Sequence, residues 1–163
     1  MNDLSQNPAS QSDSINVKKH KILVVEDEVD AKDLFVTLLT PVPGYELFSA
    51  ENGQVALDML EKDKSFDLIL LDIIMPVKDG IQTLQEIKTS PEKYGTPYVV
   101  MLTNVGSDSA LESAEKLKAD DYIMKIDTEP EELLKKIKAL LEKRDNPQAE
   151  PAKEDVTPAS AAA

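Results

Sequence analysis

The chain has 163 residues, a formal net charge of -13 and no cysteine. This length suits one ordinary domain with tails. The lack of cysteine excludes disulfides, thiolate metal sites and cysteine nucleophiles, and the acidity argues against direct binding to nucleic acid or to an anionic membrane. No apolar run approaches the roughly 20 residues of a membrane span, and the N-terminus lacks the apolar core of a signal peptide. We therefore expect a cytoplasmic protein without membrane insertion.

The first half of the chain alternates short apolar runs with helical patterns. Residues 1–18 are polar and lack apolar periodicity, which predicts a disordered tail. His20, the only histidine, is expected to be exposed and is given no role. Apolar residues at helical spacing predict helices that begin near Val29 and near Val55. Buried strands are predicted at 22–25 and 68–71, and a further strand at 45–49.

The second half continues the alternation up to about Arg144. Helices are predicted at 81–88 and from Ser107 to about Leu117. The segment 90–97, which joins the helix at 81–88 to the strand at 98–102, reads as a long polar connection. Thr128 and Glu131 resemble a capping box at the start of the last helix. Strands are predicted at 98–102 and 121–124. Residues 145–163 are rich in Pro, Ala, Glu, Lys, Asp and Ser, which predicts a second disordered tail.

Five strands that alternate with five helices predict an α/β fold. Such alternation is typical of a doubly wound parallel sheet with helices on both faces. The sequence therefore predicts one such domain at residues 19–144.

Polar side chains follow four of the predicted strands. They are Glu26 and Asp27 after the first, Asp72 after the third, Thr103 after the fourth and Lys125 after the fifth. The carboxyl ends of parallel strands share one edge, where ligand sites of open α/β sheets lie. Two simpler interpretations remain: Asp72 satisfies loop amides, and the acids after the first strand favour the positive end of a helix dipole.

The chemistry of this set favours a metal and a phosphoryl group. Close carboxylates repel one another, and Mg²⁺ relieves that repulsion through oxygen ligands. A phosphoryl group on Asp72 would supply further oxygens, and aspartyl phosphates are known covalent intermediates. Thr103 could donate a hydrogen bond to one phosphoryl oxygen, and Lys125 could pair with another.

The same segments resemble the receiver domain of bacterial two-component response regulators. The resemblance rests on residues 22–28, 70–76 with Asp79-Gly80, Leu102-Thr103 and 119–125. It covers about residues 19–143 and implies a flavodoxin-like sheet of order 2-1-3-4-5. It also implies that Asp72 is the phosphoacceptor and that the phosphoryl donor is a histidine kinase or a histidine phosphotransfer protein.

The resemblance further implies a metal site and a switch. Asp27, Asp72 and the main-chain carbonyl of Ile74 would bind Mg²⁺, with Glu26 acting directly or through water. Thr103 and Tyr122 would form the switch, in which the hydroxyl moves toward the phosphate and the ring turns inward. Without the resemblance, Thr103 is a β-branched strand residue and Tyr122 an ordinary half-buried tyrosine.

Four positions depart from the family pattern. Ile126 stands where the family usually has proline, so a trans peptide is expected. Asn104 is larger than the usual residue and could narrow access to the phosphate. Ile74 and Val105 flank the site where polar side chains would otherwise orient an attacking water. We therefore hypothesise slow spontaneous loss of the phosphoryl group.

The sequence thus predicts a stand-alone receiver, because no output module is recognised after Arg144. It would signal by a phosphorylation-dependent contact with an unknown downstream protein or by onward phosphotransfer, and would catalyse at most its own phosphorylation and dephosphorylation. One alternative is a phosphohydrolase of the haloacid dehalogenase type, but that class places an Asp-x-Asp pair at the first strand. The other is a phosphorylation-independent scaffold, which the intact acid, threonine and lysine set argues against.

Overall fold

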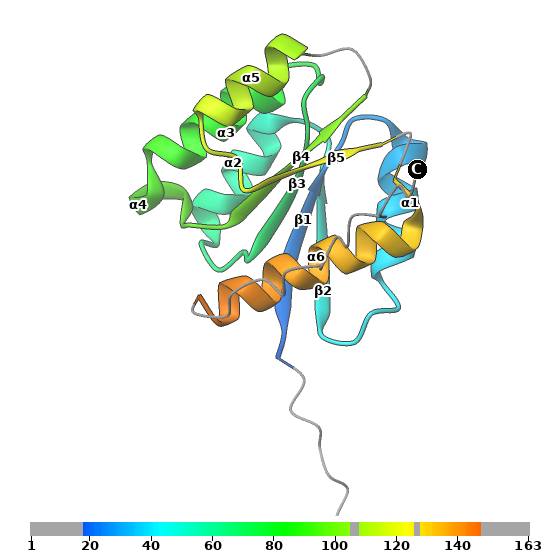
Figure 1. Cartoon of the computed structure of the whole chain (residues 1–163). Coiled ribbons are helices and arrows are strands. Elements are labelled where there is room, and N and C mark those ends of the chain that lie inside the picture. The colour runs from blue at the N-terminus through cyan, green and yellow to red at the C-terminus, as the bar shows by residue number, and fades with distance from the viewer. Residues whose placement is uncertain (1–17, 105–107, 126–127, 148–163) are drawn as a thin grey trace, which may run out of the picture.

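The computed structural model describes residues 18–104, 108–125 and 128–147. Their centre is a parallel sheet of order β2-β1-β3-β4-β5 (Figure 1). This order confirms the predicted doubly wound, flavodoxin-like fold. The strands are β1 (His20–Val25), β2 (Tyr45–Ala50), β3 (Leu68–Asp72), β4 (Tyr98–Thr103) and β5 (Asp121–Met124).

Helices cover both faces of the sheet (Figure 1). Successive strand residues point to opposite faces, so Leu23 and Val25 pack into one core cluster, and Ile22 and Val24 into the other. The helices are α1 (Val29–Leu39) and α6 (Pro130–Asp145) over one face, and α2 (Gly53–Lys62), α3 (Gly80–Thr89), α4 (Pro91–Tyr94) and α5 (Asp108–Lys116) over the other.

The described residues form one helix more than the sequence predicted. The one-turn helix α4 lies within the segment 90–97, which was expected to be a polar connection. Pro91 occupies the start of the helix, where its missing N–H is not needed. The ring of Tyr94 is buried against the core, and its hydroxyl donates to Glu86 Oε2 at 3.2 Å. Four residues are too few to show a helical period, so the pattern could not reveal this turn.

Two local predictions were wrong. The last helix is not capped by Thr128, because its N-cap is Glu129, which makes no side-chain capping bond within the described part of the chain. His20 is not exposed: only 8% of its surface is accessible. The helix α6 also continues to Asp145, one residue past the predicted domain end.

Several other predictions fall on residues that the structure does not describe. These are most of the two predicted tails (1–17 and 148–163), the helix start at Ser107, Val105, and the Lys125–Ile126 peptide bond. None of the helices in the described ranges has the length and hydropathy that a bilayer span requires.

Candidate phosphoryl and metal site

Three carboxylates meet at the carboxyl edge of the sheet. Oxygens of Glu26, Asp27 and Asp72 all lie within 4.8 Å of one another. Glu26 and Asp72 are buried, whereas Asp27 is exposed. A buried pair of carboxylates beside an exposed one is an all-oxygen donor set that fits a hard divalent cation with some water ligands. The predicted convergence of strands β1 and β3 on one site is therefore present.

Lys125 bridges two of these carboxylates. Its backbone N–H donates to Thr103 O at 2.9 Å, which extends the pairing of β4 with β5 by one residue. Its ammonium Nζ lies 3.1 Å from Asp72 Oδ1 and forms an ion pair with Glu26 Oε2. One cation thus neutralises carboxylates from two different strands.

The electrostatics reflect burial opposed by this lysine. Burial raises the pKa of the Glu26 and Asp72 carboxyls, against the hydrogen bond and charge of Lys125. Burial by itself would lower the pKa of Lys125, yet its hydrogen bonds and charge interactions with Glu26 and Asp72 raise it. Two buried acids that share one ammonium retain net negative charge, so a divalent cation at this edge would be stabilised.

Thr103 lies beside the phosphoacceptor candidate. Asp72 pairs with Leu102 across β3 and β4, so Thr103 is one residue beyond that pair. Its hydroxyl is buried and donates to Asn104 O at 3.0 Å. The register therefore brings Thr103 to the same edge as Asp72 and Lys125, as the sequence predicted.

The simpler interpretations also describe part of the geometry. Asp72 Oδ1 accepts the N–H of Ile73 at 2.8 Å, so Asp72 does satisfy a loop amide. Glu26 Oε1 accepts the N–H of Glu28 at 3.2 Å, just before α1. Neither bond accounts for Asp27 or for the bridging position of Lys125.

The loop after Asp72 is held in a defined shape that the sequence did not reveal. Lys78 N donates to Pro76 O at 2.8 Å, and Val77 between them has φ 69°, which makes a γ-turn. Gly53 N at the start of α2 donates to Lys78 O at 3.2 Å, and Gly80 N donates to Ile73 O at 2.9 Å. Ile74 and Val77 are left exposed at 71% and 82%.

Tyr122 directs its hydroxyl into the protein. The ring packs against the core cluster that also contains Leu84 and Met101. The hydroxyl oxygen is buried and has no hydrogen-bond partner in the structure as described. Burial, with smaller contributions from Glu115, Asp121 and Asp120, raises the pKa of Tyr122.

We expect Tyr122→Phe to raise the free energy of unfolding by about 1 kcal/mol, because the hydroxyl is desolvated without a compensating bond. Urea unfolding of the unphosphorylated protein measures this. Tyr94→Phe is the matched control, since the Tyr94 hydroxyl donates to Glu86, and it should not stabilise the protein. A Tyr122→Phe protein less stable than the native chain would contradict the expectation.

Comparison with known proteins places this geometry in a family. The family model of the response regulator receiver domain matches residues 22–138. The chain belongs to the response regulator receiver domain family. The receiver is similar to the transcriptional regulatory protein CpxR of Escherichia coli K12, with 39% identity over 122 residues, which are 75% of this chain and 49% of CpxR. The chain spans about half the length of the curated relatives that it matches.

Solved structures show the same relationship. The receiver resembles the chemotaxis protein CheY4 of Vibrio cholerae with a TM-score of 0.66 and 26% identity, covering 75% of this chain and 98% of CheY4. It also resembles a CheY-like response regulator receiver domain protein from Methanospirillum hungatei, with a TM-score of 0.68 and 29% identity. That match covers 78% of this chain and 98% of the Methanospirillum chain. Phosphorylation and Mg²⁺ binding are general properties of this family, and the three oxygen donors found here fit that metal.

Proposed function

We propose that this receiver accepts a phosphoryl group on Asp72 from a histidine kinase or a histidine phosphotransfer protein. The observation that carries the proposal is the position of Asp72, with Glu26 and Asp27 within 4.8 Å and the Lys125 ammonium 3.1 Å away. An Asp72 oxygen would attack phosphorus, and the bond from phosphorus to the donor imidazole nitrogen would break. The donor nitrogen keeps that electron pair, so the donor leaves as neutral imidazole once its ring carries one proton, either already on the other ring nitrogen or taken up from solvent.

Each side chain at the edge has a part in this reaction. Asp27, Asp72 and the main-chain carbonyl of Ile74 would hold Mg²⁺, with Glu26 acting directly or through water. The bound metal would neutralise charge on the phosphoryl oxygens. Lys125 would turn from Glu26 toward a phosphoryl oxygen, and the Thr103 hydroxyl would exchange its bond to Asn104 for a bond to another.

The phosphorylated receiver would then signal to other proteins. Thr103 and Tyr122 would form the switch, because both lie on strands next to the site and a new double negative charge biases nearby two-state elements. The output would be a phosphorylation-dependent contact with a downstream protein or onward phosphotransfer. Catalysis by the receiver would be limited to its own phosphorylation and dephosphorylation.

The direct test uses acetyl phosphate, with Mg²⁺ or with EDTA, and intact-mass measurement. We expect the native chain to gain one phosphoryl group only with Mg²⁺, and Asp72→Asn to gain none. Asp58→Asn, which changes an exposed acid on α2, is the control and should be phosphorylated like the native chain. Equal phosphorylation of Asp72→Asn would refute the assignment. Capture of the same downstream protein by Asp72→Asn and by the phosphorylated chain would favour a scaffold instead.

The phosphoryl group should be lost slowly. Ile74 is 71% exposed on the loop that follows Asp72, where its apolar side chain cannot orient an attacking water. We expect Ile74→Asn to shorten the half-life of the phosphorylated protein several-fold, measured as decay of the phosphorylated mass in Mg²⁺ after removal of the donor. Val77→Asn, on the same loop, is the control. An unchanged decay rate in Ile74→Asn would contradict the hypothesis.

A further inference from the structure

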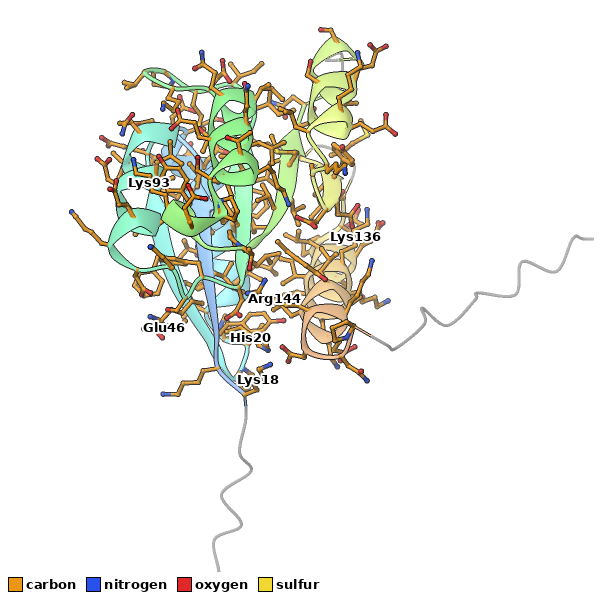
Figure 2. All side chains as sticks on the ribbon, turned by 90° about the vertical axis from the view of Figure 1, so that its left-hand side faces the viewer. Lys18, His20, Glu46, Lys93, Lys136 and Arg144 are labelled. Atoms are coloured by element: carbon orange, nitrogen blue, oxygen red, sulfur yellow. The ribbon has the colours of Figure 1, made fainter. Side chains whose placement is uncertain are left out.

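The far end of α6 is held to the sheet by a cluster of charged residues around one histidine. We call this cluster the α6 clasp; it consists of Lys18, His20, Asp67, Arg144 and Asp145. Figure 2 shows Lys18, His20 and Arg144 near the end of the sheet where β1 begins. The parallel strands carry Asp72 and Lys125 at their other end. The clasp is therefore separate from the phosphoryl site, about one strand length away.

Arg144 makes the central contacts of the clasp. Its Nε lies 3.1 Å from Asp67 Oδ1, and its Nη1 donates to Thr96 O at 2.6 Å. Its guanidinium carbon lies 5.7 Å from the centre of the Tyr98 ring. A planar guanidinium with three partners loses less freedom per bond than a flexible ammonium does. The last turn of α6 is thus fixed to the starts of β3 and β4.

Asp67 is itself held firmly, because it directly precedes β3 and its backbone is hydrogen-bonded to β1 and β4. Its Oδ2 accepts the N–H of Lys21 at 3.0 Å, its own N–H donates to Lys21 O at 2.9 Å, and its carbonyl accepts Tyr98 N–H at 2.9 Å. Arg144 therefore binds a carboxylate that cannot move without β1, β3 and β4. This distinguishes the contact from an ion pair between two mobile surface side chains, which contributes little.

Lys18, two residues before β1, adds a second attachment, and His20 at the start of β1 lies beside it. The buried ring of His20 lies between two carboxylates, with Nδ1 3.8 Å from Asp67 Oδ2 and Nε2 3.4 Å from Asp145 Oδ2. It also contacts Tyr45 edge to face, with ring centroids 6.3 Å apart. Lys18 forms an ion pair with Asp145. The side chains of the last turn of α6 are thus held at three strand starts.

The first turn of α6 is attached through the buried side chain of Leu133, and its polar side chains make fewer hydrogen bonds and ion pairs with other described residues than those of the last turn. Residues 129–132 are exposed, and Glu129 makes no side-chain capping bond in the described ranges. A hollow of about 40 Å³ lies beside this turn, between α1, β5 and α6, and is lined in part by Leu34, Met124 and Pro130. This end of the helix, with the hollow beside it, begins five residues after Lys125. The helix is about 24 Å long, so its two ends lie in different surroundings.

We propose that the α6 clasp makes the last turn of α6 the fixed end of this helix, so that phosphorylation of Asp72 displaces the turn beside Lys125 and leaves the clasped turn in place. The displacement rests on the proposed function, whereas the holding of the last turn does not. In the phosphorylated protein α6 pivots about Arg144. A partner that reads the phosphorylated state through α6 would contact its first two turns.

The test is amide hydrogen exchange of the full chain, with and without acetyl phosphate and Mg²⁺. We compare the native protein with Arg144→Gln and with the control Lys138→Gln. A third variant, Arg144→Lys, keeps the positive charge but lacks the planar guanidinium with its several N–H donors. Lys138 lies on the same helix, has 73% of its side chain exposed and only approaches Glu142 at 3.9 Å. In Arg144→Gln, amides 141–145 should exchange about ten-fold faster, with a smaller increase in Arg144→Lys and none in Lys138→Gln.

Phosphorylation of the native protein should change exchange at amides 133–137, the first amides of α6 with helical hydrogen bonds, and not at 141–145. In Arg144→Gln the change should extend along the whole helix. Native protection of the last turn in both Arg144 variants would overturn the proposal, as would a response of the native last turn as large as that of the first. If Arg144→Gln does not fold, Arg144→Lys decides. A native chain that gains no phosphoryl mass would refute the proposed function and the displacement, whereas the exchange of the unphosphorylated variants would still decide whether the clasp holds the helix.

Discussion

Replacement of Lys125 by methionine is expected to lower the free energy of unfolding by about 3 kcal/mol at pH 7 without metal. This is the typical cost of removing one partner of a buried ion pair, because the other charge is left buried and unpaired. The side chain of Glu26 is 1% exposed, and that of Lys125 is 11% exposed. Without the ammonium, Glu26 and Asp72 remain as two buried carboxylates with no fixed cation between them. Chemical denaturation in EDTA measures the loss.

The pH dependence of this loss has a defined sign. Burial already raises the pKa of Glu26 and Asp72, and removal of Lys125 raises both further. A carboxyl whose pKa is higher in the folded state binds more protons when folded, so its effect on stability becomes less unfavourable as the pH falls. The deficit of Lys125→Met should therefore shrink on acidification, as both carboxyls become neutral.

Two further variants separate this cause from others. Glu26→Gln in the Lys125→Met background should restore much of the lost stability, because it removes the unpaired charge. Lys138→Met, on an exposed position of α6, should leave stability unchanged. A Lys125→Met deficit that is the same at acidic and neutral pH would show that lost packing, rather than unpaired charge, is responsible.

Replacement of Gly80 by alanine is expected to cost about 3 kcal/mol, at the upper end of overpacking effects. A Cβ at this position would lie 2.1 Å from Asp72 O and 2.9 Å from Ile73 Cα. Both are backbone atoms, so no flexible side chain can yield. At an ordinary helix position, replacement of glycine by alanine would raise the free energy of unfolding. A decrease in Gly80→Ala would therefore indicate the close approach of the Asp72 backbone.

The same substitution should also slow phosphorylation by acetyl phosphate, because the clash displaces the residue that carries the acceptor. Thermal unfolding and the rate of mass increase measure the two effects. Gln85→Ala, at an exposed position of α3, is the control for both. Native stability in Gly80→Ala would mean that α3 can shift away from Asp72 without cost.

The fold and much of the site could be predicted because both depend on local pattern. Continuous apolar runs such as 68–71 identify strands covered on both faces, and alternation with helices makes those strands parallel. Parallel strands share their carboxyl edge, so the residue that follows each run is placed without knowledge of any contact. This is why Asp72, Thr103 and Lys125 could be brought together from sequence, whereas the four-residue helix α4, which is too short for a period, could not.

The sequence by itself determined the order of elements, the parallel sheet and the acids, hydroxyl and amine at its edge, since each depends on neighbours within a few residues. Only the tertiary structure decided that Lys125 pairs with Glu26, 99 residues earlier, that the Tyr122 hydroxyl is buried, and that Lys18 and Arg144 join the end of α6 to the sheet. Those pairings depend on helix position and side-chain direction across the packed interior, where burial removes the competing bonds to water.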